Sequence, residues 1–312
     1  MHFAFPPRKT SHPPPYAARS SRSGFLRYSQ LRNILILAVG ALTTLYLLSG
    51  LFSGSTSVSI PAGTPRAVVV TTLDPSLSQS YKAAIKANRK HYAAKHGYAA
   101  FFPNTTDYPL GDNPSSWSLV PAMRHAMALY PHTPYIFYLT STALIMNPTL
   151  SIEDHIMEPR RLESLMLVDK PVVPPDSVIK TFSHLKGDRI DFVLSQDNEG
   201  LAGGSMVIRS GEWAKFFLDS WFDPLYRSYN FQKAEAHALE HIVQWHGTIL
   251  AKLALVPQRI LNSYTQGPAE GIYNEGDFVA NFHGCIRDSK RNCEAEMQPL
   301  LTRWREITDR ER

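Results

Sequence analysis

A chemical site is suggested by three successive hydroxyl side chains, Thr140, Ser141 and Thr142. They directly follow residues 135–139 (YIFYL), an apolar run that predicts a buried strand. In open α/β sheets, ligands bind beyond the carboxyl ends of the strands. A hydroxyl-rich step at such an end is therefore a candidate ligand site.

The elements that would position this step alternate between strands and helices from residue 66 onward. Strands are predicted at 67–73, 98–102, 135–139, 191–195, 204–210, 253–256 and 277–282, and helices at 75–95, 117–130, 212–221 and 233–245. This alternation predicts an α/β fold with a mostly parallel, doubly wound sheet. Residues 159–186 contain four prolines and no clear period, so we expect a long surface excursion there.

Residues 33–52 (NILILAVGALTTLYLLSGLF) carry no charge over roughly the 20 residues that a helix needs to cross a bilayer. Residues 1–32 carry six basic residues and no acidic one. The charge bias predicts a cytoplasmic tail (1–32), a transmembrane signal anchor (33–52), a Ser/Gly/Pro-rich stem (53–65) and a lumenal domain (66–312). A buried helix of a soluble domain and a cleaved signal peptide are the alternatives.

The net charge of +5 comes from the N-terminal tail. Subtracting its six basic residues from the total of 32 leaves 26, against 27 acidic residues in the chain. The body is therefore near neutral, and no basic stripe predicts binding to a nucleic-acid backbone.

Two further features suit a lumenal domain. Cys285 and Cys293 are the only cysteines, and an oxidising compartment favours a local disulfide between them over two free thiols. Asn104 begins an Asn-Thr-Thr triplet, which is an N-glycosylation acceptor, although such triplets also arise by chance.

Several blocks occur in a characteristic order: NRKHYAAKHGY (88–98), ALIMN (143–147), SQDNEGLAGGSMVIRS (195–210), HALEHIVQWH (237–246), VPQRILNSY (256–264) and EGDFVANFHGC (275–285). Over about residues 66–295 the chain resembles the fungal Golgi α-1,6-mannosyltransferases and α-1,2-galactosyltransferases. The resemblance implies a GT-A Rossmann-like fold, a type II Golgi membrane protein, Mn²⁺ and a nucleotide-sugar donor such as GDP-mannose. It extends to subunits of the mannan polymerase complex, which implies catalytically intact partner subunits and an N-glycan acceptor.

The chain departs from this family at the positions that would hold the metal. The family has Asp-x-Asp directly before ALIMN, where this chain has Thr140 and Thr142. A family histidine is replaced by Asn281, and a histidine, His283, stands two positions later and is a possible substitute ligand. A hard divalent cation needs charged oxygen ligands next to a diphosphate, so we expect no metal at these residues.

Other candidate residues remain. The family's asparagine and glutamine are Ala202 and Ala236 here, while Asp197 and Glu235 are retained and could bind acceptor hydroxyls. The alternative for both acids is solvation or helix capping. Arg124 and Arg259 could bind the donor phosphates, or they could form ordinary ion pairs.

Three functions are consistent with this sequence. The first is a subunit of a Golgi mannosyltransferase complex with weak or no catalysis of its own. The second is an active, metal-independent hexosyltransferase that uses a nucleotide-sugar donor. The third is a non-enzymatic lumenal scaffold or glycan-binding protein.

Overall fold

The computed structural model describes residues 28–52, 61–174 and 177–310, which fall into two units, 1–59 and 60–312. The first unit contains helix α1 (Tyr28–Phe52). Within the described ranges, the structure has no helix with both the length and the apolar character needed to cross a membrane. The anchor predicted for 33–52 is therefore unconfirmed. Residues 1–27 of the predicted tail and 53–60 of the predicted stem lie outside the described residues.

The second unit is built on a six-stranded sheet in the order β2-β1-β3-β6-β5-β7. The strands are β1 (Ala67–Val70), β2 (Ala99–Phe101), β3 (Tyr135–Leu139), β5 (Phe192–Gln196), β6 (Leu201–Arg209) and β7 (Leu253–Val256). β1 pairs in parallel with β2 and β3, and β5 pairs in parallel with β7. The prediction of strands alternating with helices is confirmed for this sheet.

Strand β6 makes the sheet mixed rather than mostly parallel, because it runs antiparallel to both β3 and β5. Only residues 197–200 separate β5 from β6. A parallel return would need a crossover of a dozen residues or more, so this short link forces the chain to turn straight back. The prediction of a mostly parallel sheet is therefore corrected at β6.

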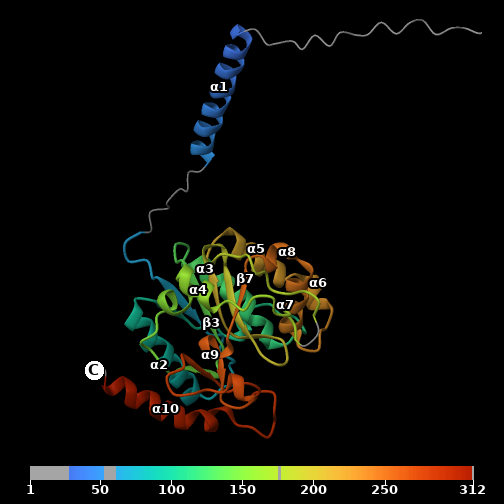
Figure 1. The fold of residues 1–312 in the computed structure, drawn as a ribbon. Coiled ribbons are helices and arrows are strands. Elements are labelled where there is room, and N and C mark those ends of the chain that lie inside the picture. The colour runs from blue at the N-terminus through green and yellow to red at the C-terminus, as the bar shows by residue number, and fades with distance from the viewer. Residues whose placement is uncertain (1–27, 53–60, 175–176, 311–312) are drawn as a thin grey trace, which may run out of the picture. The chain divides into compact units, whose positions relative to one another are not determined.

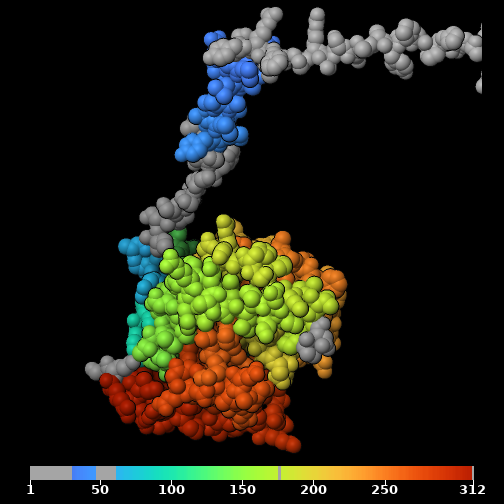
Figure 2. Space-filling model, in the orientation of Figure 1, coloured from blue at the N-terminus to red at the C-terminus, as the bar shows by residue number. Residues whose placement is uncertain are grey.

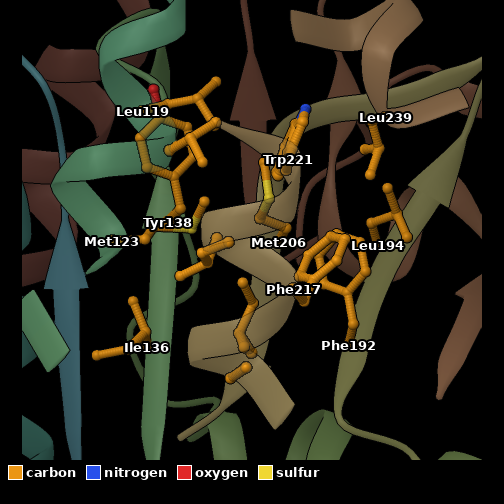
Figure 3. Close-up of a cluster of buried hydrophobic side chains, with 14 of the residues drawn as sticks. Leu119, Met123, Ile136, Tyr138, Phe192, Leu194, Met206, Phe217, Trp221 and Leu239 are labelled. Carbon is orange, nitrogen blue, oxygen red and sulfur yellow. The ribbon is translucent and has the colours of Figure 1, made fainter. Parts of the chain in front are cut away.

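Helices cover both faces of the sheet (Figure 1). One face packs against α3 (Leu119–Leu129), α5 (Glu212–Trp221) and α7 (Ala234–Trp245). The other packs against α2 (Gln79–His96), α4 (Pro159–Leu165) and α9 (Gln258–Leu261). Figure 3 shows Phe217 and Trp221 of α5 beside Phe192, Leu194 and Met206 of the sheet.

A smaller sheet in the order β4-β9-β8 lies beside the large one. It contains β4 (Ala143–Ile145), β8 (Ser263–Tyr264) and β9 (Val279–Asn281). Apolar side chains of α10 (Cys293–Arg310) and α2 pack together with this sheet. The last part of the chain, dark orange to red, gathers at the bottom of the unit in Figure 2. A disulfide joins Cys285 to Cys293 at the start of α10.

The sequence pattern missed the short strands β4 and β8 and several short helices. These helices include α4, α6 (Pro224–Ser228) and α8 (Gly247–Leu250). α4 lies inside the predicted surface excursion, where the Glu158 carboxylate accepts hydrogen bonds from the backbone N–H groups of Arg160 and Arg161. Its seven residues are too few for an apolar period to stand out, although a Pro at the first turn is a helix-start signal.

The neighbours Phe216 and Phe217 provide a matched test of the core. Phe217 is fully buried and Phe216 is 58% exposed. Phe217→Ala should lower the free energy of unfolding by about 3–5 kcal/mol, because it leaves a cavity under the sheet. Phe216→Ala should change it by about 0.5 kcal/mol or less. Urea unfolding of both variants checks this, and equal losses would contradict the packing described.

Candidate functional site

A pocket of about 360 Å³ opens at one edge of the large sheet. β1, β3 and β5 run in the same direction, so their carboxyl ends meet at this edge, and antiparallel β6 begins there. The pocket is lined by residues that follow these ends, including Thr72, Thr140 and Asp197, and by Leu201 of β6. The volume falls at the lower end of the roughly 300–1,000 Å³ that is typical of small-molecule sites. The expected location of the site is thus a real cavity.

The backbone of the Thr140–Ser141–Thr142 turn is fixed from several sides. The Thr140 N–H donates to Gly204 O (2.8 Å), and Thr142 O accepts from the Phe282 N–H (2.9 Å). The Tyr81 hydroxyl donates to Ser141 O (2.9 Å). None of these bonds uses a threonine side chain, so the shape of the turn does not depend on the threonine hydroxyls.

The threonine side chains belong to a neutral hydrogen-bonded chain. Thr142 Oγ1 lies 3.4 Å from Thr140 Oγ1 and donates to Asn281 Oδ1 at 3.1 Å. Asn281 Nδ2 donates to Asn262 Oδ1 at 2.9 Å. Asn281 is buried and packs close to Gly204, where an added Cβ would lie 2.7 Å from its Nδ2. Side chains at the three expected metal positions thus bond to one another or to a neighbouring amide.

The residues at these positions do not fit the Mn²⁺ that the family resemblance implies. Two hydroxyls and an amide supply no negative charge, and a hard cation beside a diphosphate requires it. In the described ranges, no three His, Cys, Asp or Glu side chains cluster in a way that could hold a metal ion.

His283 and Asp197 both line the pocket, and both contact Tyr264. The His283 ring stacks on the Tyr264 ring, with centroids 4.5 Å apart, and burial lowers the pKa of the His283 imidazole. The Tyr264 hydroxyl donates to Asp197 Oδ2 (2.6 Å), while Asp197 Oδ1 accepts from the backbone N–H groups of Glu199 and Gly200. His283 is therefore placed as an aromatic surface, and Asp197 anchors the loop before β6.

Two carboxylates of α7 form another part of the lining, Glu235 and Glu240. Burial raises the pKa of both. The Ser116 hydroxyl donates to Glu235 Oε2, and Glu240 Oε1 accepts from the Leu201 N–H (3.1 Å). Glu240 also explains why position 200 is a glycine, because a Cβ added there would lie 1.7 Å from Glu240 Oε1. Gly200 moreover has φ 145°, which favours glycine.

The two arginines predicted to bind the donor lie outside this lining. Arg124 Nε pairs with Asp219 (3.1 Å), and Arg259 forms a two-pronged pair with Asp277 (3.1 and 2.9 Å). Both guanidiniums thus form the ion pairs that the sequence left open as the alternative to donor binding. The cations that line the pocket are Lys233 and Arg287.

Asn104 is exposed and precedes a short 3₁₀ helix, 105–107, and its neighbour Thr105 lines the pocket. Glycosylation there stays a prediction.

Sequence reasoning missed Glu240, Tyr264 and Arg287 as lining residues. Glu240 and Tyr264 do stand within the blocks that carry the family resemblance. Arg287 follows the last block, in the loop before α10, and no local pattern singles it out.

A mixed sheet covered by helices, with a pocket over its strand ends, fits a glycosyltransferase fold with a Rossmann-like sheet, of the GT-A type. A solved glycosyltransferase involved in glycosylation of the major capsid of PBCV-1 has the same fold, with a TM-score of 0.53. It is 12% identical, and the match covers 76% of this chain and 100% of that one. At this identity the likeness shows the fold alone.

This chain belongs to the galactosyl transferase GMA12/MNN10 family, whose pattern matches residues 63–294. An uncharacterized alpha-1,2-galactosyltransferase of Schizosaccharomyces pombe is 33% identical over 64% of this chain and 62% of its own length. The probable alpha-1,6-mannosyltransferase MNN11 of Saccharomyces cerevisiae is 30% identical over 75% of this chain and 60% of its own length. The chain thus spans about 60% of the length of these relatives. The predicted family is confirmed.

The raised pKa of Glu235 makes stability depend on pH. A carboxyl with a raised folded-state pKa contributes stability below its unfolded-state pKa and loses it as pH rises through the folded-state pKa. Glu235→Gln cannot ionise, so its melting temperature relative to the parent should be higher at about pH 7 than at about pH 4. Thermal unfolding at both values measures this difference. The exposed control Glu270→Gln should show no such change, and a pH-independent Glu235→Gln difference would contradict the burial argument.

Proposed function

We propose that this chain is a type II Golgi subunit of an α-1,6-mannosyltransferase complex that elongates N-glycan mannan, with little or no sugar transfer of its own. One observation carries the proposal: Thr142 and Asn281 hydrogen bond to each other where the family would place metal ligands. Transfer from a nucleotide sugar releases a charged diphosphate, and a metal ion normally stabilises that charge. The neutral pair offers no such stabilisation.

The assembly and its place in the cell rest on separate support. Among the relatives are the probable alpha-1,6-mannosyltransferases MNN10 and MNN11. The uncharged stretch 33–52 and the basic residues before it favour a membrane anchor with the second unit in the lumen. The chain retains the family fold but not the family's metal-binding side chains. This combination suits a subunit that works beside catalytically intact partners.

The full chain, purified alone in detergent, tests the loss of catalysis. With GDP-mannose, Mn²⁺ and an α-1,6-linked mannoside acceptor, we expect transfer at least about 100-fold slower than by a family member with intact carboxylates. The expected factor follows because a Lewis-acid metal supplies several kcal/mol of transition-state stabilisation. Transfer by radiolabelled donor measures it, and robust Mn²⁺-dependent turnover by this chain alone would overturn the proposal.

Restoring the family residues tests the metal argument directly. Thr140→Asp alone should not create Mn²⁺ binding, because one carboxylate leaves the site undercharged. The triple variant Thr140→Asp, Thr142→Asp and Asn281→His should bind Mn²⁺ in calorimetry. If the parent chain binds Mn²⁺ as well as the triple variant does, the neutral positions do not explain the proposed inactivity.

Arg287 favours a second candidate function, a metal-independent hexosyltransferase. It is exposed and lines the pocket, so it could meet a phosphate. Turnover that survives a chelator and is lost in Arg287→Ala would establish this function, with Arg124→Ala as the control outside the pocket.

A scaffold unrelated to mannan synthesis is tested by co-purification, because only a complex subunit would co-purify with family members that have intact carboxylates.

A further inference from the structure

We propose that the pocket binds a neutral oligosaccharide, and that Thr140 and Thr142 bind its hydroxyl groups where the family site would hold a metal-bound diphosphate. This inference rests on the proposed function. It holds that the pocket, having lost its metal ligands, binds a different ligand rather than none. The ligand class follows from three properties of the pocket: its charge, its hydrogen-bonding groups and its ring surface.

The charge of the lining disfavours a nucleotide diphosphate. Five carboxylates line the pocket: Asp74, Asp197, Glu199, Glu235 and Glu240. The lining cations are Lys233 and Arg287, and Lys233 is already paired with Glu199 (3.3 Å). A diphosphate carries several negative charges and would face these carboxylates with no divalent cation to offset them. A neutral sugar experiences no such repulsion.

The hydrogen-bonding groups suit sugar hydroxyls. A hydroxyl donates one hydrogen bond and accepts others, so Thr140 and Thr142 can each bond to a sugar while remaining in their neutral chain. A carboxylate has lone pairs for several donors, so Glu235 can accept from a sugar as well as from Ser116. Charged acceptors of this kind form strong hydrogen bonds with neutral hydroxyls.

The pocket also offers a ring surface for the apolar C–H face of a pyranose. Tyr264 and His283 stack in parallel and both line the cavity. Burial lowers the pKa of His283, which keeps this surface uncharged near neutral pH. Ile286 adds a largely exposed apolar side chain to the same lining. Polar groups and aromatic rings in one cavity match the hydroxyl groups and the apolar C–H face of a sugar.

The test measures binding to the full chain in detergent. The probes are α-1,6-linked mannotriose, GDP and GDP-mannose, each with and without Mn²⁺. Trp221 lines the pocket, so tryptophan fluorescence can follow binding, with calorimetry as the second measurement. We expect saturable binding of the trisaccharide and at least about 10-fold weaker binding of GDP and GDP-mannose, whether or not Mn²⁺ is present.

Variants assign the binding to this pocket. Thr142→Val should weaken trisaccharide binding about 5-fold or more, because one hydrogen bond is lost and Asn281 is left without its donor. Thr142→Ser keeps the hydroxyl and should retain most of the affinity. Thr302→Val, at an exposed position of α10, is the matched control and should bind like the parent. If the Thr142→Val variant does not fold, Glu235→Ala tests in the same way whether removing a hydrogen-bonding group of the pocket weakens trisaccharide binding.

The outcomes separate this inference from the proposed function. Absence of trisaccharide binding, or tighter binding of GDP-mannose than of the trisaccharide, overturns the inference even if the chain transfers no sugar. Unchanged affinity in folded Thr142→Val and Glu235→Ala variants also overturns it. Robust Mn²⁺-dependent turnover overturns the proposed function, and the binding data still decide which ligand the pocket prefers.

Discussion

The buried guanidinium of Arg89 holds together the region on which the site depends. It is fully buried, and Nη2 donates to Thr140 O while Nη1 donates to Asn88 Oδ1, both at 2.8 Å. Asn88 in turn bonds to both the N–H and the carbonyl of Ile145, each at 2.9 Å. Two neighbouring side chains of α2 thereby fix the turn and the strand after it, where the chain passes from the large sheet to the small one. Burial lowers the pKa of Arg89 to about 9, which shows how far this charge is removed from water.

This clamp explains how a chain can keep the family fold while its metal positions change. Arg89 and Tyr81 bind backbone carbonyls of the turn, and the remaining supports are backbone hydrogen bonds. The side chains at 140 and 142 contribute little to the shape of the turn, so their replacement by threonine changes its charge without unfolding it. Asn281 then satisfies the Thr142 hydroxyl from the neighbouring strand. Fold and metal binding are separable here because they use different atoms of the same residues.

The sequence predicted the ends of some elements well, where an apolar run stops abruptly at polar residues, but placed the end of β1 and the start of β6 three residues too late. β3, α5 and β7 have the expected bounds, and the pocket lies beyond β3 as the Thr-Ser-Thr step predicted. The direction of β6 follows from the link of four residues, 197–200, which is too short for a parallel return. Hydrophobic periodicity does not show that β5 and β6 are paired, so the sequence pattern did not reveal this direction. The sequence left two roles open for Arg124 and Arg259 for a similar reason: a basic side chain can bind a phosphate or a carboxylate. Only the fold brings Asp219 and Asp277 to them.

The two acids of α7 show which parts of the pocket support the fold and which remain open to a ligand. Glu240 accepts the Leu201 N–H and fills the space that a glycine at 200 leaves, so it fixes the β5–β6 link. Glu235, five residues earlier, accepts from Ser116 at the pocket wall, and its own carbonyl accepts from Trp221 Nε1 at 2.9 Å. Burying this carboxylate opposes folding at neutral pH. Asp197 and Glu240 fix the link between β5 and β6 without Glu235. The cost of burying Glu235 is therefore better explained by a ligand than by the fold.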